Sequence, residues 1–370
     1  MLLPLEEWLQ EKAKRKPTSF PNRDQNYFNL YDAQKAKFSQ HIYPHVNSAM
    51  TVLDGPRVES GSEPTVYTDH GIGHTNAVIE TAGRLLGCSR KNSKLSLEPY
   101  EVYLLLMTIL SHDAGNIEGR RDHQMKIYKL LDQRLTKVLD DTVEMREIHD
   151  IAQSHTGKGI VSGLESKDTI VSLGKEKTLS SIVYHPRRIA ALLRFADEIC
   201  EDRKRIPEIL LNNPSVSSGP SVPYLRFGQS ITSVDILKDR QSIRIQFDLQ
   251  PEHVLRPLEF VNNEGQIQKK YLIDVVMSRL GKIRRERSYC FRFLHGVVEF
   301  ASVTADINVI EEADDGNFRA HPMGTIDMSE ADYPSEIDDR FLSTYPTFSG
   351  EALRDRVSGT LELTHNGETI

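Results

Sequence analysis

An adjacent histidine and aspartate, His112 and Asp113, end a run of apolar residues and offer the first chemistry in this sequence. The run LLLMTILSHD covers residues 104–113, and its apolar positions do not alternate with polar ones. Such a segment is buried on nearly all sides, and burying an imidazole beside a carboxylate is costly unless both find a partner. Two interpretations follow for this pair: the two side chains hydrogen-bond each other at a helix end, or they bind a divalent metal.

Four further residues of the same chemical types stand at or near the ends of predicted helices: His74, His123, His155 and Asp197. Asp197 follows Leu193 by four residues, so it lies beside the apolar face of its helix, where a carboxylate needs a partner. His123 also has a simpler interpretation, as a helix-start residue that hydrogen-bonds the preceding turn. Together with His112 and Asp113, these residues form an ordered set along the chain, each at or near a helix end.

The helices that must position these residues are predicted from the spacing of apolar residues. The helix that carries His74 ends at Gly87, and Ser96 is the predicted N-cap of the helix that ends in His112-Asp113. Further helices are predicted over about 122–139, in MREIHDIAQSHTGKG (145–159) with His155 at the C-terminal end, and from Pro186 through HPRRIAALLRFADEICEDRKR. A polar loop is predicted between the last two.

Beyond about residue 210 the spacing changes to the alternation typical of strands. SIRIQFDLQ (242–250) is a predicted strand, SITSVDILKD (230–239) is its hairpin partner, and VVEFASVTADINVI (297–310) is strand-like. YLIDVVMSRLGKIRRER (271–287) is a predicted amphipathic helix. The basic run Lys282, Arg284, Arg285 and Arg287 is expected to be a solvated helix end, favourable at the C-terminal dipole, or a nucleic-acid contact.

The expected fold class is therefore mainly α, a helical body with a small α+β lobe C-terminal to it. The predicted domains are a helical N-terminal arm (1–64) that packs on the body through its aromatic residues, the helical domain (65–212), the α+β lobe (213–310) and an acidic, loosely structured extension (311–370). No internal repeat is found.

Composition excludes several classes of protein. The net charge of −7 argues against a general nucleic-acid coat, and no apolar run reaches the length of a membrane span. The charged start, MLLPLEEWLQEKAKRK, lacks the apolar core of a signal peptide. The three cysteines are odd in number and far apart, which indicates reduced thiols. We expect a cytoplasmic protein with no membrane association.

Taken in order, these motifs resemble those of the HD superfamily of metal-dependent phosphohydrolases. HTNAV (74–78) is similar to the family's opening His-Ser/Thr-x-x-Val, SHDAG (111–115) to its His-Asp pair, and LLRFADEICEDR (192–203) to its closing Leu-x-x-Ala-Asp segment. HTG (155–157) is similar to the segment that supplies an extra histidine in members with two metals. The resemblance covers about residues 67–205.

The resemblance implies a set of metal ligands. His74, His112, Asp113 and Asp197 would bind the first metal, and Asp113 would bridge to a second held by His123 and His155. Ligands of these types suit Mn, Fe, Co or Ni, while Mg remains an option where carboxylates and water dominate. The implied cofactor is one or two divalent metal ions, and a metal-activated water would attack phosphorus.

Contacts to the substrate phosphate are harder to assign from the family pattern. Where some two-metal members have a lysine soon after the His-Asp pair, this chain has Asn116. Arg121 and Lys158 are the candidates for phosphate contact, with Arg120 in reserve. Asp69 or His70 could donate a proton to the leaving group, and both stand close to the first ligand in sequence.

The expected activity is hydrolysis of a phosphoester or phosphoanhydride bond in a nucleotide-type substrate, by a nucleotidase or phosphodiesterase. One alternative is a metal-dependent single-strand nuclease that uses the basic stretch 281–288, whose substrate binding should weaken steeply with salt. Another is a non-catalytic sensor or scaffold that binds a nucleotide or a partner protein. A phosphorylated small molecule is the expected partner, with nucleic acid less favoured.

Overall fold

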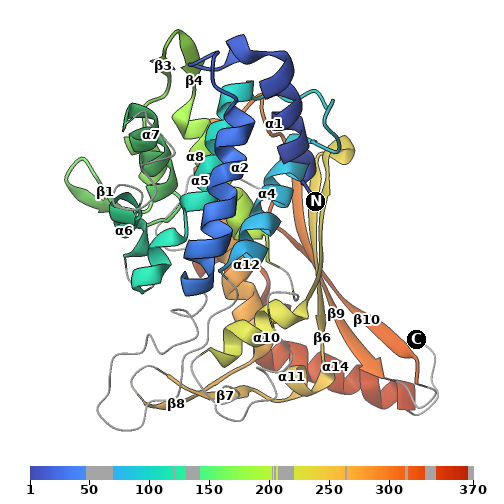
Figure 1. Cartoon of the computed structure of the whole chain (residues 1–370). Coiled ribbons are helices and arrows are strands. Elements are labelled where there is room, and N and C mark those ends of the chain that lie inside the picture. Colours follow the sequence, from blue (N-terminus) through green and yellow to red (C-terminus); the bar gives the residue numbers. More distant parts are fainter. Residues whose placement is uncertain are drawn as a thin grey trace. The chain divides into compact units, whose positions relative to one another are not determined.

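A computed structural model of the chain (Figure 1) describes residues 1–46, 70–119, 122–130, 142–201, 203, 206, 221–262, 265–312, 316–329 and 339–365. The chain divides into two compact units. The first comprises residues 1–51, 69–200 and 286–299, and the second comprises residues 52–68, 201–285 and 300–370. Helix α12 (Leu272–Leu294) is divided between them after Arg285.

Helix α5 (Pro99–Ser111) is the centre of the first unit, and every one of its residues is buried. Its predicted start at Ser96 is wrong, because Glu98 is the N-cap and Pro99 the first helical residue. The backbone N–H of Glu98 donates to Glu101 Oε2 at 3.0 Å, so a carboxylate within the first turn satisfies a donor at the helix start. The helix ends where His112 and Asp113 begin a short 3₁₀ turn, Ala114–Glu118.

The described helices that pack against α5 are α1 (Pro4–Arg15), α2 (Tyr27–Lys37), α4 (Ile72–Leu86), α7 (Thr142–Gln153) and α8 (Pro186–Ile199). In the N-terminal arm, Trp8, Phe28 and Tyr31 are buried, which is why this polar stretch packs on the body. Helix α6 (His123–Leu130) packs on α7 and on the 3₁₀ turn after α5. Helix α4 ends at Gly87, whose φ of 72° is the left-handed conformation that glycine adopts at helix C-termini.

The segment between α7 and α8 was expected to be a polar loop, but it forms two small antiparallel hairpins. Strands β1 (Gly159–Val161) and β2 (Leu164–Ser166) form the first, and β3 (Lys177–Leu179) and β4 (Ile182–Tyr184) the second. Both turns place two residues at positive φ, Ser162-Gly163 and Ser180-Ser181. Such two-residue turns suit tight hairpins, and the short strands gave no clear alternation in sequence.

A mixed four-stranded sheet forms the body of the second unit, in the order β10-β9-β6-β5. The strands are β5 (Ile231–Leu237), β6 (Ser242–Leu249), β9 (Ser302–Glu312) and β10 (Phe318–Asp327). The predicted hairpin of β5 with β6 is confirmed, and β6 pairs with β9 in parallel. One face is apolar: Ile243, Ile245, Phe247 and Leu249 of β6 are all buried. A smaller hairpin joins β7 (Leu258–Val261) to β8 (Ile267–Lys270).

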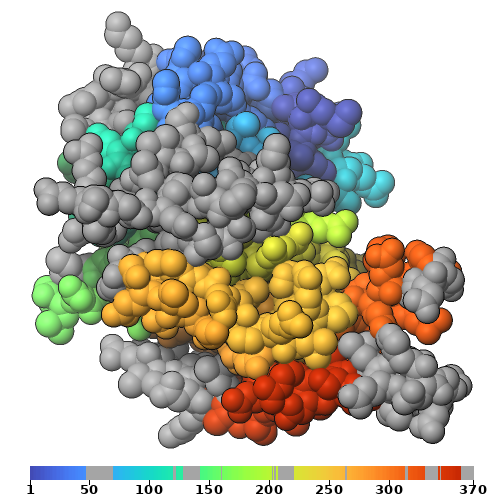
Figure 2. Space-filling model, turned by 90° about the horizontal axis from the view of Figure 1, so that it is seen from below, coloured from blue at the N-terminus to red at the C-terminus, as the bar shows by residue number. Residues whose placement is uncertain are grey.

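Helices complete the second unit: α10 (Val222–Ser230) contacts β5, β6 and β7, and α11 (Pro251–Leu255) contacts β9. The expected loosely structured extension contains β10 and two helices, α13 (Asp339–Thr344) and α14 (Gly350–His365). Helix α14 packs on α11 and is the red helix in Figures 1 and 2. Its Leu353 and Val357 are buried, and such sparse apolar residues among polar ones did not reveal the helix in sequence.

The predicted fold class, a mainly helical protein with an α+β part, is therefore confirmed. Among the described residues, no helix combines the length and the apolar character needed to cross a membrane.

Candidate metal centre

All six predicted ligands lie in the first unit, each close to an end of a helix. His74 is the third residue of α4, which starts at Ile72, and His123 is the first residue of α6. His112 and Asp113 follow α5, and His155 follows α7 by two residues. Asp197 lies in the last turn of α8. The helix packing around α5 brings these ends together.

The first group of side chains surrounds Oδ2 of Asp113. His74 Nε2 lies 3.5 Å and His112 Nε2 lies 3.4 Å from this oxygen. Asp197 approaches the same two rings from α8, with its Oδ1 3.1 Å from His74 Nε2 and 3.7 Å from His112 Nε2. Both imidazoles are almost fully buried, whereas the Asp197 side chain is 28% exposed. Two imidazole nitrogens and two carboxylates thus face one point, with one side open to solvent.

The second group surrounds the other oxygen of Asp113. His123 Nε2 lies 3.3 Å from Asp113 Oδ1 and 3.3 Å from His155 Nε2. The amide of Asn116 donates to the same Oδ1 at 2.9 Å. Asp113 therefore presents one oxygen to each group, as a carboxylate that bridges two metals does. The ligand atoms of His74, His112 and Asp113, and those of Asp113, His123 and His155, form two compact clusters, each within 4.8 Å.

The tautomers of two histidines fit metal binding. His112 Nδ1 lies 2.8 Å from the Ile109 carbonyl, and His155 Nδ1 lies 2.6 Å from the Ala152 carbonyl. Because a carbonyl can only accept, Nδ1 of each ring donates, and Nε2 of the neutral ring is left with its lone pair. Nε2 of His112 is buried and has no hydrogen-bond partner among the described residues. A buried ring nitrogen of this kind is unfavourable unless something binds it, which fits a metal ligand.

Charge in the metal-free centre is shared between the carboxylates and His112. Burial disfavours the imidazolium, but Asp113 and Asp197 outweigh it and raise the pKa of His112 to about 9. Burial also opposes ionisation of Asp113, yet the charges of neighbouring histidines, His112 first, hold its pKa well below the usual range. Burial and then the charges of His112 and His123 lower the pKa of His155 to about 3, so its ring stays neutral.

Two glycines of the motifs allow the second group to assemble. A Cβ on Gly115 would lie 1.9 Å from the His123 carbonyl oxygen, so only glycine lets α6 start this close to Asp113. A Cβ on Gly157 would lie 3.0 Å from Nη2 of Arg194, a buried arginine of α8. Both glycines are therefore explained by close packing beside a ligand.

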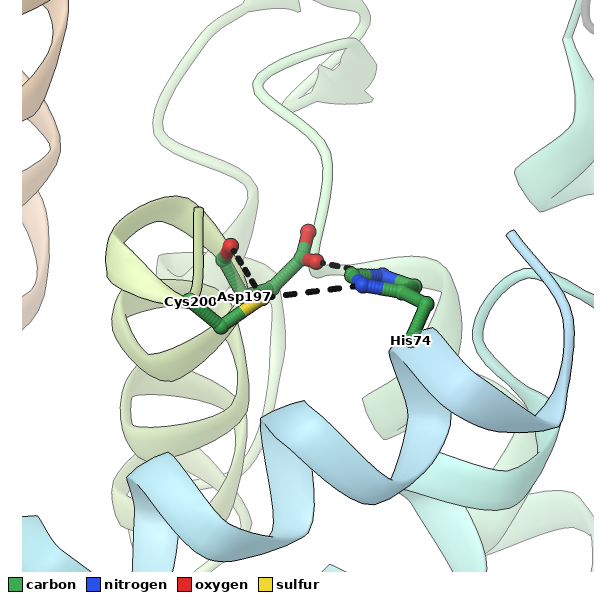
Figure 3. Close-up of side chains that lie close together, drawn as sticks. All are labelled: His74, Asp197 and Cys200. Carbon is green, nitrogen blue, oxygen red and sulfur yellow. Dashed lines mark hydrogen bonds and ion pairs between the residues drawn. The ribbon is translucent and has the colours of Figure 1, made fainter. Parts of the chain in front are cut away.

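Cys200, which sequence reasoning missed, lies with Asp197 beside the ring of His74 (Figure 3). Its thiol donates to the Asp197 carbonyl at 3.2 Å, and its sulfur lies 3.6 Å from His74 Nδ1. His74, Asp197 and Cys200 form a third group of candidate ligands. Because His74 Nε2 faces the two carboxylates, the sulfur is placed to accept a hydrogen bond from Nδ1–H. Only the fold brings Cys200 to His74, although Cys200 follows the predicted ligand Asp197 by three residues in the sequence.

The other predicted site residues are less closely grouped. His70 is buried, with its ring centroid 5.6 Å from that of His74, whereas Lys158 is exposed. Asp69, Arg120 and Arg121 lie outside the described residues. The basic stretch of α12 is not the solvated helix end that was expected. The helix continues to Leu294, and Arg287 is buried with its guanidinium 4.9 Å from the Phe291 ring centroid.

Comparison with family models adds an independent finding. A model described as HD-CE matches residues 65–281, more than half of the chain. The chain belongs to this HD-domain family. The search of curated proteins and the search of solved structures found no match. The matched range contains all six ligands that the resemblance to HD proteins implied.

Proposed function

We propose that this protein is a metal-dependent phosphohydrolase that cleaves a phosphoester or phosphoanhydride bond of a nucleotide-type substrate. The observation that carries the proposal is the position of Asp113, whose two oxygens face two separate groups of histidines. Enzymes of the HD superfamily are typically metal-dependent phosphohydrolases, which supports the reaction class.

In this proposal His74, His112, Asp113 and Asp197 bind the first metal, and Asp113, His123 and His155 bind the second. The donors are imidazole and carboxylate groups, which favour Mn, Fe, Co or Ni, with Mg as a further option. When bound, such metals supply an activated water and neutralise charge on phosphate oxygens. The Asp197 side chain is 28% exposed, so solvent reaches the group on this side, as a catalytic rather than a structural metal site requires.

The chain's own residues would orient these groups. The Asn116 amide holds the oxygen of Asp113 that faces His123, which fixes the rotation of the bridging carboxylate. We propose Lys158, which is exposed, as a contact for the phosphate, since an ammonium pairs well with phosphate oxygens. His70, buried beside His74, remains our candidate for the proton donor to the leaving group.

The test is a hydrolysis assay on metal-free protein reconstituted with Mn²⁺, Fe²⁺, Co²⁺, Ni²⁺ or Mg²⁺ and offered mono-, di-, tri- and cyclic nucleotides. We expect phosphate or nucleoside monophosphate release with at least one metal, and none from the Asp113→Asn variant. Wild-type protein that retains two metals but hydrolyses none of these nucleotides would contradict the proposal and favour a binding role.

A further inference from the structure

A buried hydroxyl holds the backbone on both sides of His155. Thr169, which begins a short 3₁₀ turn, places its Oγ1 2.7 Å from the Ser154 carbonyl and 2.8 Å from the Thr156 carbonyl. Thr169 is buried, and its single hydroxyl proton serves these two acceptors. The residues directly before and after His155 are thus held by one side chain, which is not among the proposed ligands.

Arg194 connects this hydroxyl to the helix that carries Asp197. Its Nη1 donates to Thr169 Oγ1 at 3.2 Å and to the Lys167 carbonyl at 2.9 Å. Arg194 lies in α8, three residues before Asp197, and is only 2% exposed. One guanidinium therefore joins the segment that positions His155 to the helix that positions Asp197.

Glu286 fixes the guanidinium in place. Nε of Arg194 donates to Glu286 Oε2, and Nη2 donates to Oε1 at 3.0 Å, so the pair is bidentate. Both side chains are buried, and a planar, bidentate pair restricts the arginine to one orientation. The missing side chain at Gly157 makes room for Nη2, where a Cβ would approach to 3.0 Å.

We propose that Arg194 and Thr169 are positioning residues that set the spacing between the two groups of ligands, one group containing Asp197 and the other His155. The proposal rests on the two-metal centre of the proposed function. A pair that served only the stability of the fold would lower unfolding temperature without distinguishing between the two metal sites. A pair that positions His155 relative to Asp197 weakens the second site selectively, because His155 belongs to that site alone.

The decisive variant is Thr169→Val, which keeps the shape of the side chain and removes the hydroxyl. We expect the second equivalent of Mn²⁺ to bind about 10–100-fold more weakly, the usual effect of losing a group that orients a ligand, with the first equivalent unchanged. The exchange-coupled electron paramagnetic resonance signal of a close Mn²⁺ pair should disappear at stoichiometric metal. Thr169→Ser, which restores a hydroxyl, should recover both the affinity and the signal.

Ser172→Ala is the matched control, since Ser172 lies in the same turn and its hydroxyl donates to the Thr169 carbonyl at 2.7 Å. It should bind both equivalents as the wild type does. Arg194→Lys keeps the positive charge but cannot donate to Thr169, Lys167 and Glu286 together. It should therefore also lose affinity for the second metal selectively, and it replaces Thr169→Val as the test if that variant does not fold. Circular dichroism checks the fold of each variant.

The outcomes separate this inference from the proposed function. Wild-type protein that binds two Mn²⁺ ions, with folded Thr169→Val or Arg194→Lys binding them equally well, overturns the positioning role and leaves the two-metal centre intact. Equal weakening of both equivalents also overturns it, because that result indicates general destabilisation. Wild-type protein that binds no metal overturns the centre, and this inference with it.

Discussion

Replacing Gly115 by alanine should remove the second metal site while leaving the first. The added Cβ would lie 1.9 Å from the carbonyl oxygen of His123 and 2.8 Å from its carbonyl carbon, whereas real Cβ contacts are essentially never under 3.0 Å. The carbonyl oxygen must therefore move by about 1.1 Å, the difference between 3.0 and 1.9 Å. Because these atoms are backbone, no side-chain rotation relieves the clash.

That displacement is large on the scale of metal coordination. Bond lengths to a metal hold to within about 0.2 Å, and His123 Nε2 lies 3.3 Å from both Asp113 Oδ1 and His155 Nε2. Moving the start of α6 by about 1 Å should lower affinity for the second metal by at least about 10-fold. The extra methyl group should also lower the free energy of unfolding by about 1–3 kcal/mol, as overpacking does.

Isothermal titration of metal-free protein with Mn²⁺, with metal content measured after dialysis, checks this prediction. Gly83→Ala is the control, because Gly83 lies within α4 and a Cβ there would meet Leu5 Cβ at an ordinary contact distance of 3.6 Å. This variant should retain both metals. A folded Gly115→Ala variant that binds two equivalents with wild-type affinity would refute the reasoning that this glycine admits His123 to the centre.

Three further predictions concern the centre and its surroundings. Because the pKa of His112 is raised to about 9, a metal must displace a proton from this ring at neutral pH. The apparent affinity of the first site for metal should therefore rise with pH until about 9 and then level off. Metal titrations at several pH values test this, and an affinity that does not change with pH would contradict it. Cys200→Ala should lower the metal affinity of the first site about 10-fold, because it removes a hydrogen-bond partner of His74 Nδ1, and Cys200→Ser should largely restore that affinity. Equal metal affinities in the wild type and both variants would contradict a role for this hydrogen bond. Leu353→Ala should lower the free energy of unfolding by about 2–5 kcal/mol, because it removes a buried side chain. The metal content should not change, since α14 belongs to the second unit and the ligands to the first. Loss of metal would show that the centre depends on the second unit.

Much of the helical body was predictable because strong signals agree there. The buried helix α5, the Gly87 stop of α4 and the helix after Pro186 each combine an apolar pattern with a clear start or end signal. The predicted start of α5 is two residues too early, because serine is the commoner type of N-cap residue, whereas Glu98 takes this position three residues before Glu101. The general preference for serine at N-caps therefore pointed to Ser96, whereas in the folded protein Glu98 takes the N-cap position.

Features that depend on contacts distant in sequence could not be predicted. Cys200 contacts His74 across 126 residues, and Arg194 contacts Glu286 across 92, so neither pair leaves a local pattern. Helix α14 is anchored where Gly350 meets Tyr271 so closely that a Cβ would lie 2.2 Å from the ring. The basic residues of α12 looked solvated by type, yet Arg287 is buried against Phe291.

The most direct test of the account is the number of metal ions that the purified protein retains. Metal-free protein that is reconstituted with Mn²⁺ and dialysed should hold two equivalents of metal by elemental analysis. The Asp113→Ala variant should hold none, because both groups of ligands share Asp113, and it should keep the circular dichroism of a helical protein. A folded Asp113→Ala variant that retains two equivalents, or a wild type that retains none, would contradict the assignment of this centre.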